Sequence, residues 1–206
     1  MASDTTNDVT NKASDILAQF THKSTDYRIH GEPALESLVE MTKALGKNLA
    51  GIRSVFDVYG RGHLVLLMGI AKYQARFPGA AIDLPEHPGA RPPAPAFETP
   101  AEAETRRATY STKLAAYNLY QDVQRAAWQF IKDCIEALYL TGIEDDYTGP
   151  RFSLAELVNW LYDNYGTMTE PQIETYRMRM MKQWQFSSPI QAMYKQVEDN
   201  AYYIKN

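Results

Sequence analysis

The sequence predicts an all-α protein: a multi-helix bundle with one long helix and a proline-rich connector. Apolar residues recur at three- and four-residue spacing over most of the chain, as in amphipathic helices. Four segments also match the capping box that starts helices, in which Ser or Thr precedes Glu or Gln by three positions. They begin at Thr99, Ser153, Thr169 and Ser188. With 206 residues, of which 45% are hydrophobic, the chain can bury one sizeable core.

The chain is expected to divide into a short N-terminal segment and one helical domain. Residues 1–31 are polar and weakly periodic, so we expect a flexible segment there. Ile16, Leu17 and Phe20 indicate at most a short helix within it. The helical domain is expected to cover residues 32–206.

The first half of that domain is predicted to contain short elements. They are a helix from about Pro33 to Gly51, a loop or short hairpin over 51–63, a buried segment over 64–68 and a short helix over 69–77.

A proline-rich connector follows over residues 78–100. Seven of the eleven prolines fall here, and they exclude a regular helix or a central strand. They are Pro78, Pro85, Pro88, Pro92, Pro93, Pro95 and Pro100. We expect a semi-rigid extended spacer. Pro92 and Pro95 also fit P-x-x-P, so a proline-rich recognition motif is the alternative.

The second half is predicted to be helical throughout. A helix is expected from Pro100 to Leu140, about 60 Å long if unbroken, with Gly142 as a left-handed cap. Three more helices should follow the later capping boxes. Their inward faces are expected to hold Leu154, Leu157, Val158, Leu161 and Tyr162 in the first, Ile173, Tyr176, Met180 and Trp184 in the second, and Ile190, Met193, Tyr194, Val197, Ala201 and Ile204 in the third.

Catalytic and metal-binding templates are missing from the sequence. The single cysteine, Cys134, lies on the apolar stripe of the long helix, so we interpret it as a core residue. The four histidines are scattered, without the spacing of a zinc site, and His63 is interpreted as a structural or a surface histidine. No G-x-S-x-G, Walker A or dinucleotide-binding motif occurs. We therefore expect no enzyme, no cofactor, no metal site and no catalytic residue.

Net charge and hydropathy limit the classes of partner that we expect the chain to bind. A net charge of −4 argues against a dedicated nucleic-acid binder. The longest apolar run, Leu64–Met68, is far shorter than the roughly 20 residues that a membrane span needs, so no membrane partner is expected. Since the N-terminal residues hold no apolar signal core, we expect a soluble, cytoplasmic protein.

Two groups of residues are candidates for contacts with other molecules. The first is a soft apolar patch, which can be core or an adaptable contact surface because methionine repacks easily. As a candidate self-association surface it comprises Met178, Met181, Trp184, Met193 and Tyr194. The second is the acidic cluster Glu144, Asp145 and Asp146, which can be a solvated loop or can form salt bridges with a neighbouring subunit.

Several blocks, in order, carry a resemblance to a known family. They read GHLVLLM over 62–68, LYLTGIEDDYTG over 138–149, LAELVNWLYDNYGTMT over 154–169, QIETYRMRM over 172–180, and PIQAMYKQVED over 189–199, with Trp184 between the last two. In this order and spacing the chain resembles the Gag capsid region of copia-type LTR retrotransposons. The resemblance covers roughly residues 50–200 and is strongest over 154–199.

The resemblance implies a structural protein. Gag polypeptides of that family self-assemble into a shell around the RNA of the element, and their capsid is all-helical with two lobes. The match corresponds to the N-terminal lobe. It implies a cytoplasmic, virus-like particle built from homo-oligomers. No C-x₂-C-x₄-H-x₄-C zinc knuckle is present, so we expect RNA contact only indirectly or through segments outside these residues. The alternative is a helical adaptor that binds another protein, including a domesticated relative of Gag.

Overall fold

The computed structural model describes residues 5–57, 60–79, 82–145, 149–150, 152–168, 170–182 and 189–205. Within these ranges every regular element is a helix, apart from one two-residue antiparallel ladder, which confirms the all-α prediction. The elements are α1 (Thr5–Gln19), the 3-10 helix η1 (Ser24–Tyr27), α2 (Leu35–Gly51), α3 (Leu64–Met68), α4 (Ile70–Arg76), α5 (Pro100–Cys134), the 3-10 helix η2 (Ala137–Leu140), β1 (Glu144–Asp145), β2 (Gly149–Pro150), α6 (Leu154–Tyr165), α7 (Glu170–Met181) and α8 (Ile190–Lys205).

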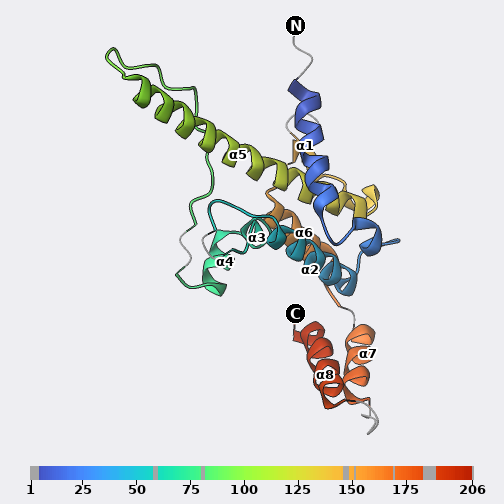
Figure 1. The fold of residues 1–206 in the computed structure, drawn as a ribbon. Coiled ribbons are helices and arrows are strands. Elements are labelled where there is room, and N and C mark those ends of the chain that lie inside the picture. The colour runs from blue at the N-terminus through green and yellow to red at the C-terminus, as the bar shows by residue number, and fades with distance from the viewer. Residues whose placement is uncertain are drawn as a thin grey trace.

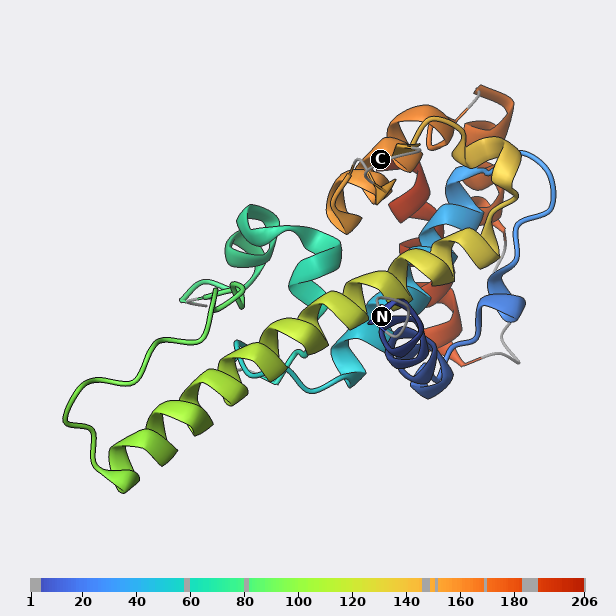
Figure 2. The same ribbon diagram turned by 90° about the horizontal axis from the view of Figure 1, so that it is seen from above.

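The helices form a central body from which two parts project. The body contains α1, α2, α3, α6 and the C-terminal half of α5 (Figure 1). The N-terminal half of α5 extends from it as an arm, and the proline-rich connector runs back along that arm (Figure 2). A helical hairpin of α7 and α8 lies on the far side of α2 and α6 (Figure 1).

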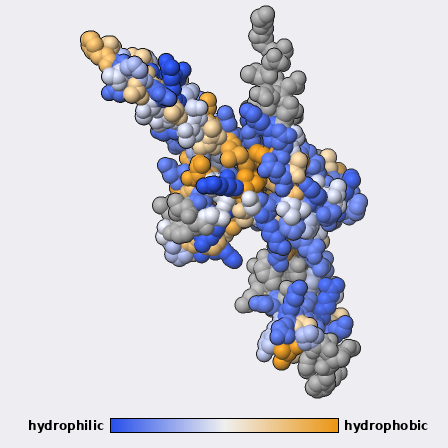
Figure 3. Space-filling view, viewed as in Figure 1, coloured by the Kyte–Doolittle hydropathy of each residue, from blue (hydrophilic) through white to orange (hydrophobic). Residues whose placement is uncertain are grey.

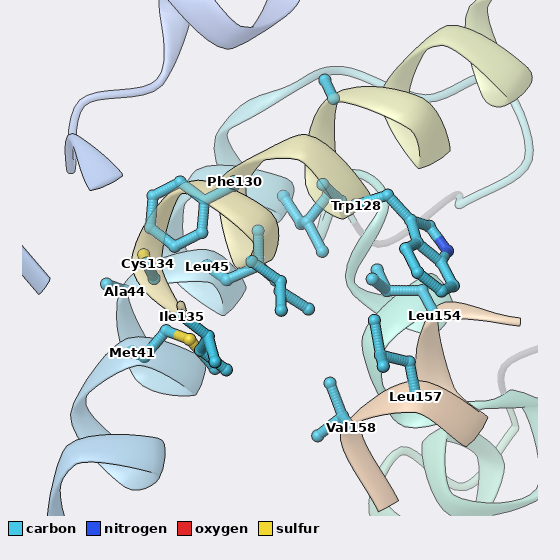
Figure 4. Close-up of a cluster of buried hydrophobic side chains, with 14 of the residues drawn as sticks. Met41, Ala44, Leu45, Trp128, Phe130, Cys134, Ile135, Leu154, Leu157 and Val158 are labelled. Carbon is cyan, nitrogen blue, oxygen red and sulfur yellow. The ribbon is translucent and has the colours of Figure 1, made fainter. Parts of the chain in front are cut away.

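The core lies between α2, α5 and α6. Its members are apolar side chains at helical spacing on the facing stripes of these helices (Figure 4). Fully buried examples are Leu45, Phe130 and Leu157, each with an exposed fraction of 0%. Burial of each such side chain contributes about 1.5–3 kcal/mol. These residues hold the body together and fix the direction in which α5 leaves it.

The N-terminal segment differs from the flexible one that the sequence predicted. From residue 5 onward it forms α1 and η1, and it packs on α5. Phe20 is 1% exposed and meets Phe130 edge-on, with 5.9 Å between ring centroids. The buried amide of Asn48 accepts from the His22 backbone N–H at 2.9 Å and donates to the His22 carbonyl at 2.8 Å. Ile16, Phe20 and Ile29 of this segment therefore belong to the same core as the rest of the body.

The first capping boxes start their helices as predicted. Thr99 Oγ1 accepts from the Glu102 backbone N–H, and the Glu102 carboxylate accepts from the Thr99 backbone N–H at 2.8 Å. Ser153 and Glu156 repeat this reciprocal pair at the start of α6, which has Gly166 at its C-cap. Each cap stabilises its helix by about 1 kcal/mol. The capping residues Thr169 and Ser188 lie outside the described residues.

The long helix ends at Cys134 rather than at Leu140. The Cys134 carbonyl, which a continuing helix would pair with the Leu138 N–H, instead accepts from the Ile29 N–H at 2.7 Å. Ile135 takes an extended conformation, and the chain resumes as the short 3-10 helix η2. Gly142 has the predicted left-handed φ of 83°, but it follows η2 rather than α5.

A glycine and a histidine close the C-terminus of α2. Gly62 (φ 58°) approaches the last turn of the helix, and the His63 backbone N–H donates to the Leu49 carbonyl at 2.9 Å. The His63 ring is 1% exposed, and its Nδ1 lies 3.2 Å from the Ile52 carbonyl oxygen. This confirms the structural interpretation of His63. The described residues between α2 and α3 form a loop, not a hairpin.

The proline-rich connector is fastened to α5 along its length. The Arg106 guanidinium binds both carboxylate oxygens of Glu98, at 2.6 and 2.8 Å, and donates to the Pro92 carbonyl at 2.7 Å. The Tyr110 hydroxyl donates to the Gly89 carbonyl at 3.1 Å. The connector has no helix or strand between residues 82 and 98, as predicted, and these contacts join it to α5 as one arm.

Candidate self-association surface

Helices α7 and α8 pair as an antiparallel hairpin and present most of the predicted contact residues. The side-chain amide of Gln196 donates to two carbonyl oxygens at the end of α7, those of Arg179 at 2.8 Å and Lys182 at 3.0 Å. These bonds satisfy carbonyls that a helix end leaves without an intrahelical partner. They fix α8 against α7 through a polar contact, which leaves apolar side chains of α8 facing elsewhere.

The residues predicted for self-association are exposed. Met178 is 61% exposed and Met181 82% on α7, while Met193 is 39% exposed and Tyr194 63% on α8. The structure therefore brings four of the five candidates onto one hairpin. Trp184, the fifth, lies outside the described residues.

Two further residues of α8 extend this surface. Ile190 is 51% exposed and Val197 is 37% exposed, although the periodicity of the sequence placed both on an inward face. Together with Met193 and Tyr194 they follow the spacing i, i+3, i+4, i+7, which defines one side of a helix. The periodicity identified the stripe correctly but could not show that the described part of the chain leaves it exposed. We call these residues and the two methionines the hairpin surface: Met178, Met181, Ile190, Met193, Tyr194 and Val197.

The inner side of α7 holds the hairpin on the body. Tyr176 is 7% exposed, and its hydroxyl donates to the Glu36 carboxylate at 2.8 Å. Arg179 lies 3.9 Å from the same carboxylate and covers the Tyr176 ring, 5.1 Å from its centroid. The predicted inward position of Tyr176 is thereby confirmed. Glu36 lies in the first turn of α2, so the hairpin is attached beside the start of that helix.

Charges of both signs surround the hairpin surface. Arg177 on α7 lies 3.4 Å from the carboxylates of Glu170 and Glu174. All three side chains are about half exposed or more, so each pair contributes less than about 1 kcal/mol. In Figure 3 the hairpin accordingly appears largely hydrophilic, with a small apolar area toward the end remote from the body. The surface is an apolar stripe with a mixed-charge rim.

The acidic cluster belongs partly to the short ladder between η2 and α6. Glu144 and Asp145 form β1, which pairs with Gly149 and Pro150 in an antiparallel ladder. Asp146 lies outside the described residues. Leu138, just before this turn, is 69% exposed. The structure does not bring the acidic cluster together with the hairpin surface.

Cys134 and His63 both lie in buried environments. Burial raises the pKa of the Cys134 thiol to about 12, and its Sγ contacts the Ser24 carbonyl at 3.6 Å. Burial lowers the pKa of His63, which favours the neutral ring. Among the described residues, no group of three His, Cys, Asp or Glu side chains is placed to hold a metal ion. No described helix is long and apolar enough to cross a membrane.

The chain was compared with family models, with curated proteins and with solved structures, and none of them matches it.

Proposed function

We propose that this chain is a Gag-like capsid protein that assembles with copies of itself into a shell, a cytoplasmic virus-like particle around retroelement RNA. The proposal assigns it no catalytic residue. Two observations support it: the ordered sequence blocks between residues 138 and 199, and the hairpin surface. The second observation carries the self-association step, because it identifies side chains that need a partner.

The exposed stripe of α8 supports a contact between helices. An amphipathic helix normally gains its stability by burying its apolar face. Here Ile190 and Tyr194 stay more than half exposed. A second copy of α8 offers the same stripe, so two copies packed side by side bury both. Methionines at the edge, such as Met181, adapt to small differences in packing.

The charges around the stripe favour a partner of the same kind. Lys195 and Glu198 flank it on α8, while Arg177 and Glu174 lie on α7. A surface with both signs can pair with a rotated copy of itself, whereas a surface with one sign would repel it. The mixed rim therefore favours self-association over binding to a strongly charged partner.

A closed shell requires more than one kind of contact, because a single two-fold contact gives only a dimer. We assign the second contact to the acidic cluster of Glu144, Asp145 and Asp146, together with the exposed Leu138. Since the cluster and the hairpin lie on separate parts of the chain, both can be occupied at once.

Light scattering and negative-stain electron microscopy at rising protein concentration test the proposal. We expect the wild-type chain to form oligomers and then particles, more so in sulfate, which strengthens apolar contacts. Tyr194→Asp combined with Met181→Asp should leave a monomer. Val55→Asp is the matched control, because Val55 is 71% exposed in a loop away from the hairpin.

The same experiment distinguishes the capsid function from the alternative, an adaptor that binds another protein. An adaptor module would stay monomeric alone at high concentration and in high salt, and would bind a foreign protein in fixed stoichiometry. Loss of that binding in the Tyr194→Asp/Met181→Asp variant would then assign the hairpin surface to the adaptor function. A monomer without particles under all conditions contradicts the capsid proposal for this chain.

A further inference from the structure

The tip of the arm displays a proline-rich segment, residues 91–97. Its sequence is Arg91-Pro-Pro-Ala-Pro-Ala-Phe97, and all seven residues are exposed. Phe97 is 97% exposed, the highest value among the exposed large apolar residues of the described chain. A large aromatic side chain in this setting has no role in the core. The segment is therefore accessible to an external partner.

The prolines restrict residues 91–95 of this segment to an extended left-handed helix, and a turn from Pro95 to Glu98 follows, in which the Glu98 N–H donates to the Pro95 carbonyl at 3.4 Å. Pro92, Pro93 and Pro95 each fix φ near −65°. Arg91, Pro92 and Ala94 each precede a proline, which excludes the α region and favours the polyproline II conformation. Five consecutive residues are thus restricted by sequence alone. With three residues per turn, Pro92 and Pro95 lie on the same side of the helix.

The arm holds both ends of the segment. One guanidinium, that of Arg106, donates to the Pro92 carbonyl at 2.7 Å and binds the Glu98 carboxylate just beyond Phe97. Arg106 also lowers the pKa of Glu98 by hydrogen bonding and by its charge, so this pair stays ionised around neutral pH. Upstream, Tyr110 binds the Gly89 carbonyl. The segment is fixed along the side that faces α5 and open on its other sides.

A ligand that is preorganised in its bound conformation loses less conformational entropy when it binds. In an unattached linker, each backbone residue that becomes ordered costs about 1–2 kcal/mol. Here the proline rings and the Arg106 contacts have already restricted the segment in the free protein. A spacer needs no such bonds, since its function is only to join two helices.

We propose that residues 91–97 are a docking ligand for a protein domain with an aromatic-lined groove for polyproline II helices. The pairs Arg91–Pro92 and Ala94–Pro95 would fill two neighbouring x-Pro pockets of such a groove, and Phe97 adds an apolar contact beside them. Arg91 and Arg107 are exposed cations at this end of the arm, so a groove with an acidic rim fits best. The segment lies on the arm, far from the hairpin surface, and the inference does not depend on self-assembly (Figure 1).

A binding titration of the full chain against purified SH3 and WW domains tests this. We expect saturable binding to at least one domain. Pro92→Ala/Pro95→Ala should weaken that binding at least tenfold. Pro85→Ala/Pro88→Ala is the matched control: it removes two prolines of the same connector that are partly buried, and the affinity should not change.

Arg106→Met tests whether the contacts with α5 preorganise residues 91–97 for binding. It leaves residues 91–97 unchanged but removes the bonds to the Pro92 carbonyl and to Glu98. We expect its affinity to fall severalfold, toward that of a synthetic peptide of residues 89–98. The Tyr194→Asp/Met181→Asp variant should bind as the wild type does, so a failure of self-assembly stays distinguishable.

Three results would overturn the inference. The first is that no domain of the panel binds at about 1 mM, a concentration at which even a contact of about −4 kcal/mol is detected. The second is that the Pro92→Ala/Pro95→Ala variant binds as tightly as the wild type. The third is that the Arg106→Met variant binds as tightly as the wild type. Circular dichroism of each variant shows whether α5 is intact.

Discussion

Gly62→Ala is expected to be the most damaging single methyl addition in the loop after α2. A Cβ at this position would clash with the Ile52 carbonyl oxygen, and it would lie 2.5 Å from that of Leu49 and 2.8 Å from that of Ala50. Real Cβ atoms do not approach backbone oxygens this closely. The φ of Gly62 is also 58°, in the left-handed region that disfavours side chains.

The magnitude follows from these two effects. The left-handed conformation costs a residue with a Cβ about 1–2 kcal/mol. Relief of the close contacts moves the chain away from α2, which breaks the His63 hydrogen bonds to Leu49 at 2.9 Å and to Ile52 at 3.2 Å. Each lost bond costs about 1 kcal/mol. We therefore expect a loss of about 3–4 kcal/mol, or about 6–16 °C in Tm for a chain of this size.

Urea unfolding followed by circular dichroism measures this loss against two matched glycines. Gly60 has a φ of 70°, but an added methyl group there would meet no atom within 4 Å, so Gly60→Ala should cost only about 1–2 kcal/mol. Gly51 ends α2 without a positive φ and with open space around it, so Gly51→Ala should stabilise the protein by about 0.5–1 kcal/mol. If Gly62→Ala costs no more than Gly60→Ala, the close approach to α2 does not contribute to stability.

Three further predictions concern buried or attached groups. Burial lowers the pKa of His63, so below about pH 6.5 the unfolded chain takes up a proton that the folded chain resists. The free energy of unfolding should then fall by up to about 1.4 kcal/mol per pH unit, as far as the folded-state pKa. His63→Gln should lack this component in urea titrations at pH 7.5 and 5.5, and an equal acid loss in both proteins would refute it. Cys134 should react with a thiol reagent only after unfolding, because burial raises its pKa to about 12; rapid modification of the native protein near pH 8 would contradict this. Tyr176→Phe removes the bond to Glu36 and should cost about 1 kcal/mol or less, while hydrogen exchange becomes faster in α7 and α8; unchanged exchange would show that this bond does not hold the hairpin.

Helix starts could be predicted from the sequence because their causes are local. Thr99 with Glu102, and Ser153 with Glu156, satisfy backbone groups within one turn, so the signal and its effect lie three residues apart. The buried position of Cys134 also followed from a local pattern, since its neighbours on the stripe of α5 are apolar.

The features that were missed depend on residues far apart in the chain. The end of α5 is set by Ile29, whose N–H takes the Cys134 carbonyl, while the residues after Cys134 carry no local stop signal. Phe20 lies in a polar stretch, and its partner Phe130 is more than a hundred positions away. Periodicity cannot encode such pairs.

The candidate surface shows a different limit of sequence reasoning. The spacing of Ile190, Met193, Tyr194 and Val197 predicted an apolar side of a helix, which is the arrangement found. Whether that side faces the core or a second molecule depends on what else is available to cover it. The pattern is the same in both cases, because burial within a chain and burial between chains have the same physical cause.

Helix α5 joins the arm and the core without a break, so a small rotation of the helix in the core moves the tip of the arm by a larger distance. The helix has 35 residues, and Leu119 is the first of them to pack against the core, so about 28 Å of it extends beyond the body. A tilt of about 5° at the core would displace the tip by about 2.5 Å over that length. Conversely, a load applied to the connector acts at a long distance from the packed half of the helix. The side chains that resist such a load are the buried ones that pack α5 into the core: Val123, Ala126, Ala127, Phe130 and Ile131.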